Sequence, residues 1–213
     1  MTDTVQTLRV AGSKLAARRR HARTRRDELP LHVRIIEVAT DLTVESGWAS
    51  VTMAGLAEAV GVSRQTIYNE VGSKPELAEA MVQHELARFL ELVEKAFDAN
   101  PTDLVAAIEE AARVVLEYAE GNALLHAVVT ATNGANTELL PLLTTQSQSL
   151  LAVAKAAIAG RIVDYRLPFS DEELDAVIDI VVRVVLSHIM EPSGSPAETA
   201  ANLSWVARLV LER

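Results

Sequence analysis

The segment from Leu56 to Tyr68 restricts the possible folds of this chain more than any other part of the sequence. Two short stretches with apolar residues at helical spacing meet there at Gly61, which can take the left-handed backbone of a tight turn. Ser63 can cap the second stretch, and Ala57 is small enough for two helices to approach closely. The pattern predicts two short helices joined by a turn and packed on a third helix through four apolar residues: Leu56, Val60, Val62 and Ile67.

The residues on either side of this segment complete a small domain. Pro30 and Gly47 bound a stretch with helical periodicity, which predicts a preceding helix. Thr52 can cap the first helix of the pair, and Pro75 suits the first position of a long helix that follows. We therefore expect a three-helix domain over residues 29–74, whose first helix carries five apolar residues at helical spacing: Ile35, Ile36, Ala39, Leu42 and Val44.

The second helix of the pair would keep polar side chains on its outer face. A helix held in this way can enter the major groove of DNA and contact base edges. The bare Ala-x-x-x-Gly spacing also occurs in ordinary helical hairpins, so by itself it leaves a purely structural role open. The side chains available to DNA would be Arg64, Gln65, Thr66, Tyr68 and Asn69.

A longer set of residues narrows this choice, and it runs from Ile35 to Leu77. It comprises Gly47, Thr52, Leu56-Ala57, Gly61-Val62-Ser63, Ile67-Tyr68 and Ser73-Lys74. In this set the chain resembles the DNA-binding signature of the TetR family of bacterial transcriptional regulators. It departs from that signature at Val71, where the family usually has phenylalanine, so we expect the packing there to be readjusted.

The resemblance implies roles for individual residues. Thr52, Tyr68 and Lys74 match positions that grip phosphates, and Gln65 and Thr66 match positions that read bases. The side chains suit these roles, because glutamine can pair with adenine through two hydrogen bonds and threonine can contact the thymine methyl group. The candidate DNA-binding residues are Thr52, Ser63, Arg64, Gln65, Thr66, Tyr68, Asn69 and Lys74.

The charge distribution agrees with a double-stranded DNA operator as partner. The chain has a net charge of −9, but residues 1–74 hold 11 Lys and Arg against 8 Asp and Glu. Positive charge is densest between Lys14 and Arg26, within a polar stretch over residues 1–28 that we interpret as a flexible basic arm. Phosphate binding needs only a local basic face. The arm could contact DNA or remain a solvated tail, and the sequence leaves both readings open.

Residues 75–213 have helical periodicity almost throughout, which predicts about six further helices and an all-α fold. The run from Leu174 to Met190 is rich in Val and Ile, yet its polar residues recur every four positions as in a helix. A capping box at residues 170–173 supports a helix start there. Other expected helices begin at Pro75, at Asn100-Pro101, at about Leu124 (ending near Thr130), at about Pro141 (ending near Asp164) and at Pro196.

The last two expected helices, over about 171–191 and 196–211, predict a homodimer. The helix around Leu174 to Met190 is apolar over most of its circumference, and one chain cannot cover such a helix on all sides. A four-helix bundle formed by the two helices and their symmetry mates would bury it. Residues 75–213 are therefore expected to form a ligand-binding and dimerisation domain.

The helices before this pair are expected to enclose a pocket for a small hydrophobic ligand. Aliphatic side chains predominate there and cations are scarce, which disfavours a highly charged ligand. The chain is also similar to actinobacterial TetR regulators of alkane and fatty-acyl metabolism over residues 63–80 and 140–151, and this similarity implies a fatty-acid-like effector. The candidate pocket residues are Phe89, Leu104, Ile108, Val115, Tyr118, His126, Leu143, Gln146 and Leu150.

Several classes of protein do not fit this sequence. The absence of cysteine excludes disulfides and thiolate metal sites, and it suits the cytoplasm. The five histidines lack paired metal spacing, and no catalytic triad, carboxylate pair or glycine-rich phosphate loop is visible, so we expect neither an enzyme nor a metal or other cofactor. Every long apolar run carries charges, and residues 1–10 lack the apolar core of a signal peptide, so we expect no membrane span.

These features lead to one hypothesis and two alternatives. The hypothesis is a ligand-responsive repressor that binds a palindromic operator as a homodimer and releases it when a hydrophobic effector shifts the helix that follows residue 74. The alternatives are a ligand-independent DNA-binding protein and an all-helical lipid carrier.

Overall fold

The computed structural model describes residues 28–126, 147–165 and 167–211, and within these ranges the regular structure is entirely helical. The all-α prediction is therefore confirmed. The basic arm up to residue 27, the end of the expected helix at 124–130, the start of the expected helix at Pro141, and the candidate residues Leu143 and Gln146 lie outside the described residues.

The first domain consists of α2 (Leu31–Ser46), the 3₁₀ turn η1 (Trp48–Ser50), α3 (Met53–Val60) and α4 (Arg64–Val71). Gly61 has φ 81° and ψ 35°, the left-handed conformation that lets α3 and α4 meet at a tight turn. Leu56 of α3 and Ile67 of α4 are fully buried against Ile35 of α2. The predicted pair of short helices on a third helix is present.

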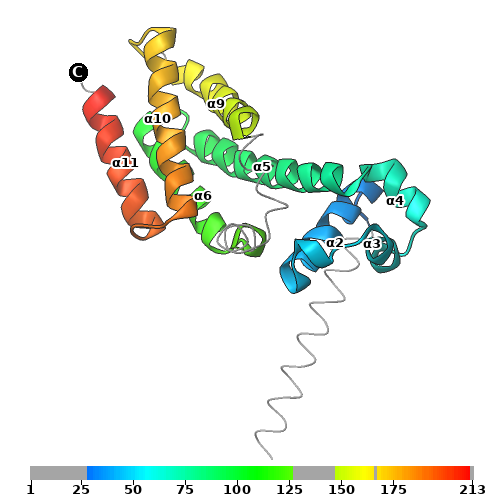
Figure 1. Cartoon of the computed structure of the whole chain (residues 1–213). Helices are drawn as coiled ribbons and strands as arrows, with labels where there is room; N and C mark the ends of the chain where they lie inside the picture. The colour runs from blue at the N-terminus through cyan, green and yellow to red at the C-terminus, as the bar shows by residue number, and fades with distance from the viewer. Residues whose placement is uncertain (1–27, 127–146, 166, 212–213) are drawn as a thin grey trace, which may run out of the picture.

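The long helix α5 (Lys74–Ala99) passes from the first domain into the second (Figure 1). Its first turns contribute Leu77 and Met81 to the core of the first domain, and its last turns contribute Ala96 and Phe97 to a second core. The helix begins one residue before Pro75, because Ser73 and Glu76 form a capping box around its first turn.

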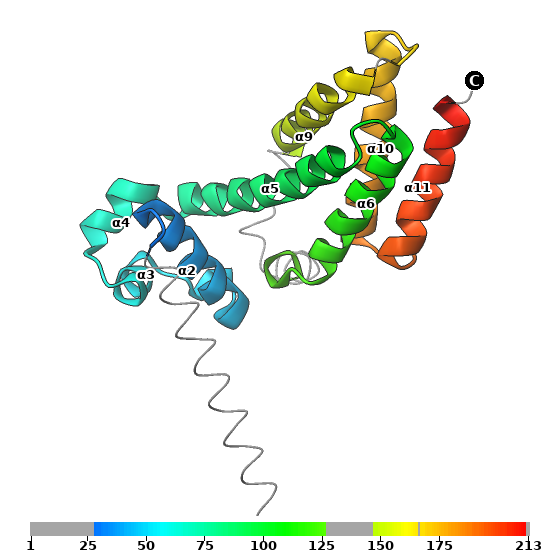
Figure 2. The same ribbon diagram turned by 180° about the vertical axis from the view of Figure 1, so that it is seen from behind.

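The second domain packs around α6 (Leu104–Glu120), which lies between α5 and α11 (Pro196–Leu211) (Figure 2). The expected start of α6 at Asn100-Pro101 was wrong. Residues 100–103 form a turn, and the side chain of Asp103 caps the helix by accepting a hydrogen bond from the Ala106 amide at 2.9 Å.

The remaining helical segments complete the second core together with α5 and α6. They are α9 (Ser147–Ile162), the 3₁₀ turn η2 (Val163–Tyr165) and α10 (Asp171–Met190), which is capped by Ser170 and Glu173 as expected. The second core joins residues of α5, α6, α9 and α10 around Phe97 and Ala107. Among the described residues, no helix is long and apolar enough to cross a membrane.

The helices α10 and α11 both lie at the end of the molecule farthest from α3 and α4 (Figures 1 and 2), and each packs on α6. Of the residues of α10, only Ile178 and Val182 are buried within one chain, whereas Ile180 is 62% exposed. Leu186, Met190 and, on α11, Trp205 and Leu209 are exposed as well. Part of the apolar circumference expected for this helix is thus uncovered in the single chain.

The burial of Leu56 predicts how strongly the first domain depends on it. Replacing Leu56, which is 0% exposed, with alanine should lower the free energy of unfolding by about 2–5 kcal/mol, because the substitution leaves a cavity between α2, α3 and α4. The measurement is chemical denaturation followed by circular dichroism. Val163→Ala, at a position 70% exposed, is the control and should change stability by less than about 0.5 kcal/mol. Equal losses in both variants would contradict this description of the core.

Candidate nucleic-acid interface and sensor cavities

Helix α4 presents a polar face to solvent and an apolar face to the first core. Arg64, Gln65, Tyr68 and Asn69 are exposed and Thr66 is half-buried. The amide nitrogen of Gln65 donates to the side-chain oxygen of Asn69 at 2.9 Å, so the two amides lie together on the exposed face. Val71 is buried in the first core, which shows that valine fills the position where the family usually has phenylalanine.

Two of the candidate residues hold the starts of the two short helices. The Thr52 hydroxyl accepts a hydrogen bond from the Gly55 amide at 3.0 Å, and the Ser63 hydroxyl accepts one from the Thr66 amide at 3.1 Å. The Thr66 hydroxyl lies 2.8 Å from that of Ser63. The hydroxyl of Thr66 is thus engaged at the start of α4.

Lys74 lies at the first turn of α5, on the same side of the first domain as η1. Its ammonium nitrogen is 4.9 Å from the centroid of the Trp48 ring and 3.5 Å from the carbonyl oxygen of Ala49. A cation over an aromatic face is attracted by the ring. The buried Trp48 therefore orients Lys74, a role that the sequence analysis did not assign to it.

The candidate pocket residues are spread over several places in the second domain. Leu104 and Ile108 line an apolar groove of about 330 Å³ between α6, α10 and α11. His126 lines a separate hollow of about 200 Å³ beyond the end of α6, and Tyr118 lines a third one that faces α2. The others are Phe89, whose ring meets Tyr118 edge to face at 5.0 Å, the buried Val115 and the half-buried Leu150.

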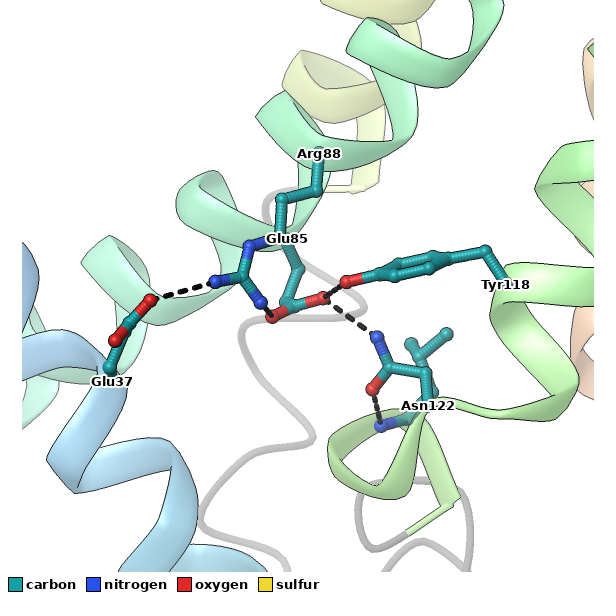
Figure 3. Close-up of polar contacts among 6 residues, drawn as sticks. Glu37, Glu85, Arg88, Tyr118 and Asn122 are labelled. Carbon is teal, nitrogen blue, oxygen red and sulfur yellow. Dashed lines mark hydrogen bonds and ion pairs between the residues drawn. The ribbon is translucent and has the colours of Figure 1, made fainter. Parts of the chain in front are cut away.

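A buried carboxylate joins the two domains at the middle of α5 (Figure 3). Glu85 is 7% exposed, and one of its oxygens accepts hydrogen bonds from the Tyr118 hydroxyl at 2.9 Å and the Asn122 amide at 2.7 Å. Arg88 lies 3.5 Å from the other oxygen and donates to Glu37 of α2 at 3.0 Å. We call these five residues the Glu85 network. Apart from Tyr118, the sequence analysis singled out none of them as site residues.

Several cations of the second domain are paired with carboxylates. Besides Arg88, Arg113 forms ion pairs with Glu110 and Glu117, and Lys155 forms ion pairs with Asp175 and Asp179. Burial raises the pKa of Tyr118 above its ordinary value, so its hydroxyl keeps the proton that it donates to Glu85. Among the residues that the structure describes, no cluster of three or more His, Asp or Glu could hold a metal ion.

Two family models match the chain. Residues 35–81 match the model of bacterial regulatory proteins of the tetR family, and residues 103–208 match the model of the bacterial tetracyclin repressor C-terminal domain. Together they cover well over half of the chain. The first matched region contains all the helices of the first domain apart from the start of α2, and the second contains α6, α9, α10 and most of α11.

Similar proteins were found by sequence and by structure. The HTH-type transcriptional regulator AlkX of Mycobacterium tuberculosis is 29% identical over 179 residues, which are 84% of each chain. The TetR family repressor AlkX of Dietzia sp., implicated in biodegradation of n-alkanes, has a similar fold, with a TM-score of 0.68, 24% identity and coverage of 84% of this chain and 96% of that one. The fatty acid degradation regulator FadR of Bacillus halodurans has a TM-score of 0.52 at 17% identity, with 84% and 95% of the two chains covered.

Proposed function

This chain belongs to the TetR family of transcriptional regulators, and from that premise we propose that it is a repressor that binds a palindromic operator as a homodimer and leaves it when a hydrophobic effector binds. The observation that carries the proposal is the exposed polar face of α4, held by the Ser63 cap and the turn at Gly61. A protein of this kind acts in the cytoplasm, where bacterial DNA lies. The relatives reported above are named as regulators or repressors, and none of those names is that of an enzyme.

The proposed contacts with DNA follow from the geometry of the first domain. Gln65 and Asn69 would face base edges from α4, with Arg64 and Thr66 beside them, and Tyr68 would meet the phosphate backbone. Lys74, positioned over Trp48, would neutralise a phosphate. Thr52 and Ser63 would act mainly by capping the N-termini of α3 and α4. The free backbone amides of these N-termini would then face the phosphates of the DNA.

The proposed dimer uses the exposed faces of α10 and α11. Ile180 and Trp205 are each 62% exposed, an unusual state for large apolar side chains, and the apolar groove between the two helices adjoins them. A second copy of the chain is the natural occupant, because an identical pair of helices supplies the same apolar surface under two-fold symmetry. Two copies would place two α4 helices on one face of DNA.

The proposed effector is a long aliphatic molecule with one polar end. The cations that lie near the second-domain cavities are paired with carboxylates, which disfavours a ligand with several negative charges. The names of similar proteins point the same way, since one concerns n-alkane biodegradation and another fatty acid degradation. The aliphatic tail would lie against α5, α6 and α9, where Phe89, Val115 and Leu150 are candidates for its contacts. Of the other candidates, Leu104 and Ile108 line the groove that the second copy would cover, and Tyr118 and His126 line two separate hollows, so one molecule would not meet all of them.

Two substitutions test the proposed reading of DNA. An operator is first selected from a random duplex library with the full chain, and dissociation constants are measured by fluorescence anisotropy. Gln65→Ala should relax specificity at one base position in each half-site, at a cost of about 1–3 kcal/mol. Lys74→Ala should weaken binding to all sequences and reduce the slope of affinity against salt by about one unit.

The chain offers matched controls for both substitutions. Gln83 and Lys95 are exposed residues of α5 outside the proposed interface, and Gln83→Ala and Lys95→Ala should leave operator affinity unchanged. If Gln65→Ala and Lys74→Ala lowered affinity by the same factor for every operator variant, the proposed division of roles would be wrong. If the wild-type chain selected no duplex, the lipid-carrier alternative would replace the proposal.

The dimer is tested by placing a charge on the exposed face of α10. Ile180→Asp should turn the dimer into a monomer in sedimentation velocity, because the bundle would bury a carboxylate without a partner. The side chain is exposed in one chain, so the circular dichroism spectrum of the monomer should stay helical. Val163→Asp, at another exposed position outside α10 and α11, is the control and should remain dimeric. An intact Ile180→Asp dimer would place the interface elsewhere.

The effector is tested with a series of saturated fatty acids titrated against the operator complex. Each added methylene should strengthen release by about fourfold until the cavity is full, because burial of one methylene contributes about 0.8 kcal/mol. Release is read from the loss of anisotropy of labelled operator. Release that does not vary with chain length, or that only short polar metabolites achieve, would exclude an aliphatic effector. If no compound released the operator, the ligand-independent DNA-binding protein would be the better description.

A further inference from the structure

Residues 121–126, here called the α6 turn, comprise the turn at Gly121-Asn122 after α6 and the first helical residues that follow it, 123–126. They belong to the second domain by sequence, but Leu124 packs into the first. Leu124 is 6% exposed and is a member of the first hydrophobic core, together with Ile35, Leu56 and Ile67. It follows directly on α6, the helix around which the second domain packs. An apolar contact therefore connects α6 to the domain that carries α4.

Asn122 fastens the same turn by polar contacts. It is buried, its amide nitrogen donates to Glu85 at 2.7 Å, and its side-chain oxygen accepts from the Leu125 amide at 3.0 Å. Its carbonyl oxygen also accepts from the His126 amide at 3.1 Å. One side chain thus shapes the turn and joins it to α5.

The Glu85 carboxylate extends this connection to the first domain. Through Arg88 it reaches Glu37 of α2, while Tyr118 and Asn122 approach it from the α6 side. A buried carboxylate that loses its hydrogen-bond donors is strongly unfavourable. Movement of the end of α6 away from α5 would remove two of those donors, so the network resists such movement in the state described here.

The opposite side of the α6 turn faces a cavity of the second domain. Leu125 and His126 line the hollow of about 200 Å³ beyond α6, with His188 and Met190 of α10 and Pro196 at the start of α11 on its other walls. A change in the packing of α10 or α11, or a molecule in this hollow, would therefore shift Leu125 and His126. Because these residues directly follow Leu124, the shift would also change how Leu124 packs in the first core.

We propose that the α6 turn, fastened by Asn122 to Glu85 and by Leu124 to the first core, is the joint that sets the orientation of the DNA-binding domain relative to the sensor domain. The proposal rests on the proposed repressor function and adds to it the residues that transmit the signal. With the joint closed, α2 and α5 are held together and α4 keeps a fixed position for operator binding. With the joint open, the first domain turns more freely about α5 and affinity for the operator falls.

The test opens the joint without touching the DNA-facing residues. Asn122→Ala should lower operator affinity about five- to tenfold while the slope of affinity against salt stays unchanged, because no phosphate contact is lost. The control is Asn100→Ala at the far end of α5, where the side-chain amide donates to the Ala96 carbonyl oxygen, away from the first domain. It should lower thermal stability without lowering operator affinity.

A second pair of measurements separates transmission from simple stabilisation. In a double-mutant cycle, Glu37→Gln and Asn122→Ala should be non-additive in operator affinity, because both act through Glu85 and Arg88. In the absence of DNA, Asn122→Ala should speed amide hydrogen exchange in α2, whereas Asn100→Ala should not. Unchanged exchange in α2 together with additive effects would overturn the proposal.

The two proposals fail in distinguishable ways. A wild-type chain that bound no operator would refute the repressor function, yet the exchange measurement would still decide whether the α6 turn orders the first domain. Normal operator binding by Asn122→Ala, with only a lower melting temperature, would refute the joint and leave the repressor function intact.

Discussion

The unbroken helix α5 is the constraint on which the rest of the structure depends, because the same 26 residues contribute to both hydrophobic cores. At 1.5 Å per residue it is about 39 Å long, so a tilt of about 10° at one end moves the other by about 7 Å. Because α5 belongs to both cores, a change in how one domain packs on α5 moves the helix and therefore also moves the other domain. The Glu85 network lies near the middle of this helix, where it joins α5 to α2 on one side and to the end of α6 on the other.

Helix boundaries were predictable wherever a local signal had no competitor. Gly61 between two short apolar stretches and the Ser170 capping box correspond to the observed turn and helix start, because both act within three or four residues. The start of α6 shows the limit of this reasoning. Pro101 and Asp103 are both acceptable start signals, and the structure uses Asp103, with the preceding turn held by a hydrogen bond from the Tyr165 hydroxyl to the Asn100 carbonyl at 2.7 Å. No local pattern contains that contact between residues far apart in the sequence.

The candidate site was predictable to a similar degree. The polar outer face of α4 follows from its periodicity, so its exposed residues could be named in advance. Trp48 and Glu85 could not be named, because each matters through a partner that the fold brings near: Lys74 for one, Asn122 for the other. Leu124 has ordinary helical surroundings in the sequence, and only the tertiary structure places it in the core of the first domain.

The exposed apolar faces of α10 and α11 give a physical reason why the proposed regulator would need two chains. Within a single chain, α5 and the Glu85 network hold α4 in a defined position relative to α6, but nothing in that chain sets the distance to another α4. In the proposed dimer, burial of Ile180 and Trp205 would set that distance. Binding to an operator of two half-sites depends on both the position of α4 within each chain and the distance between the two α4 helices, since half-site spacing reflects the separation of the recognition helices. Affinity for the operator would then respond to the packing of α10 and α11 as well as to the angle of α5, and the α6 turn lies between them.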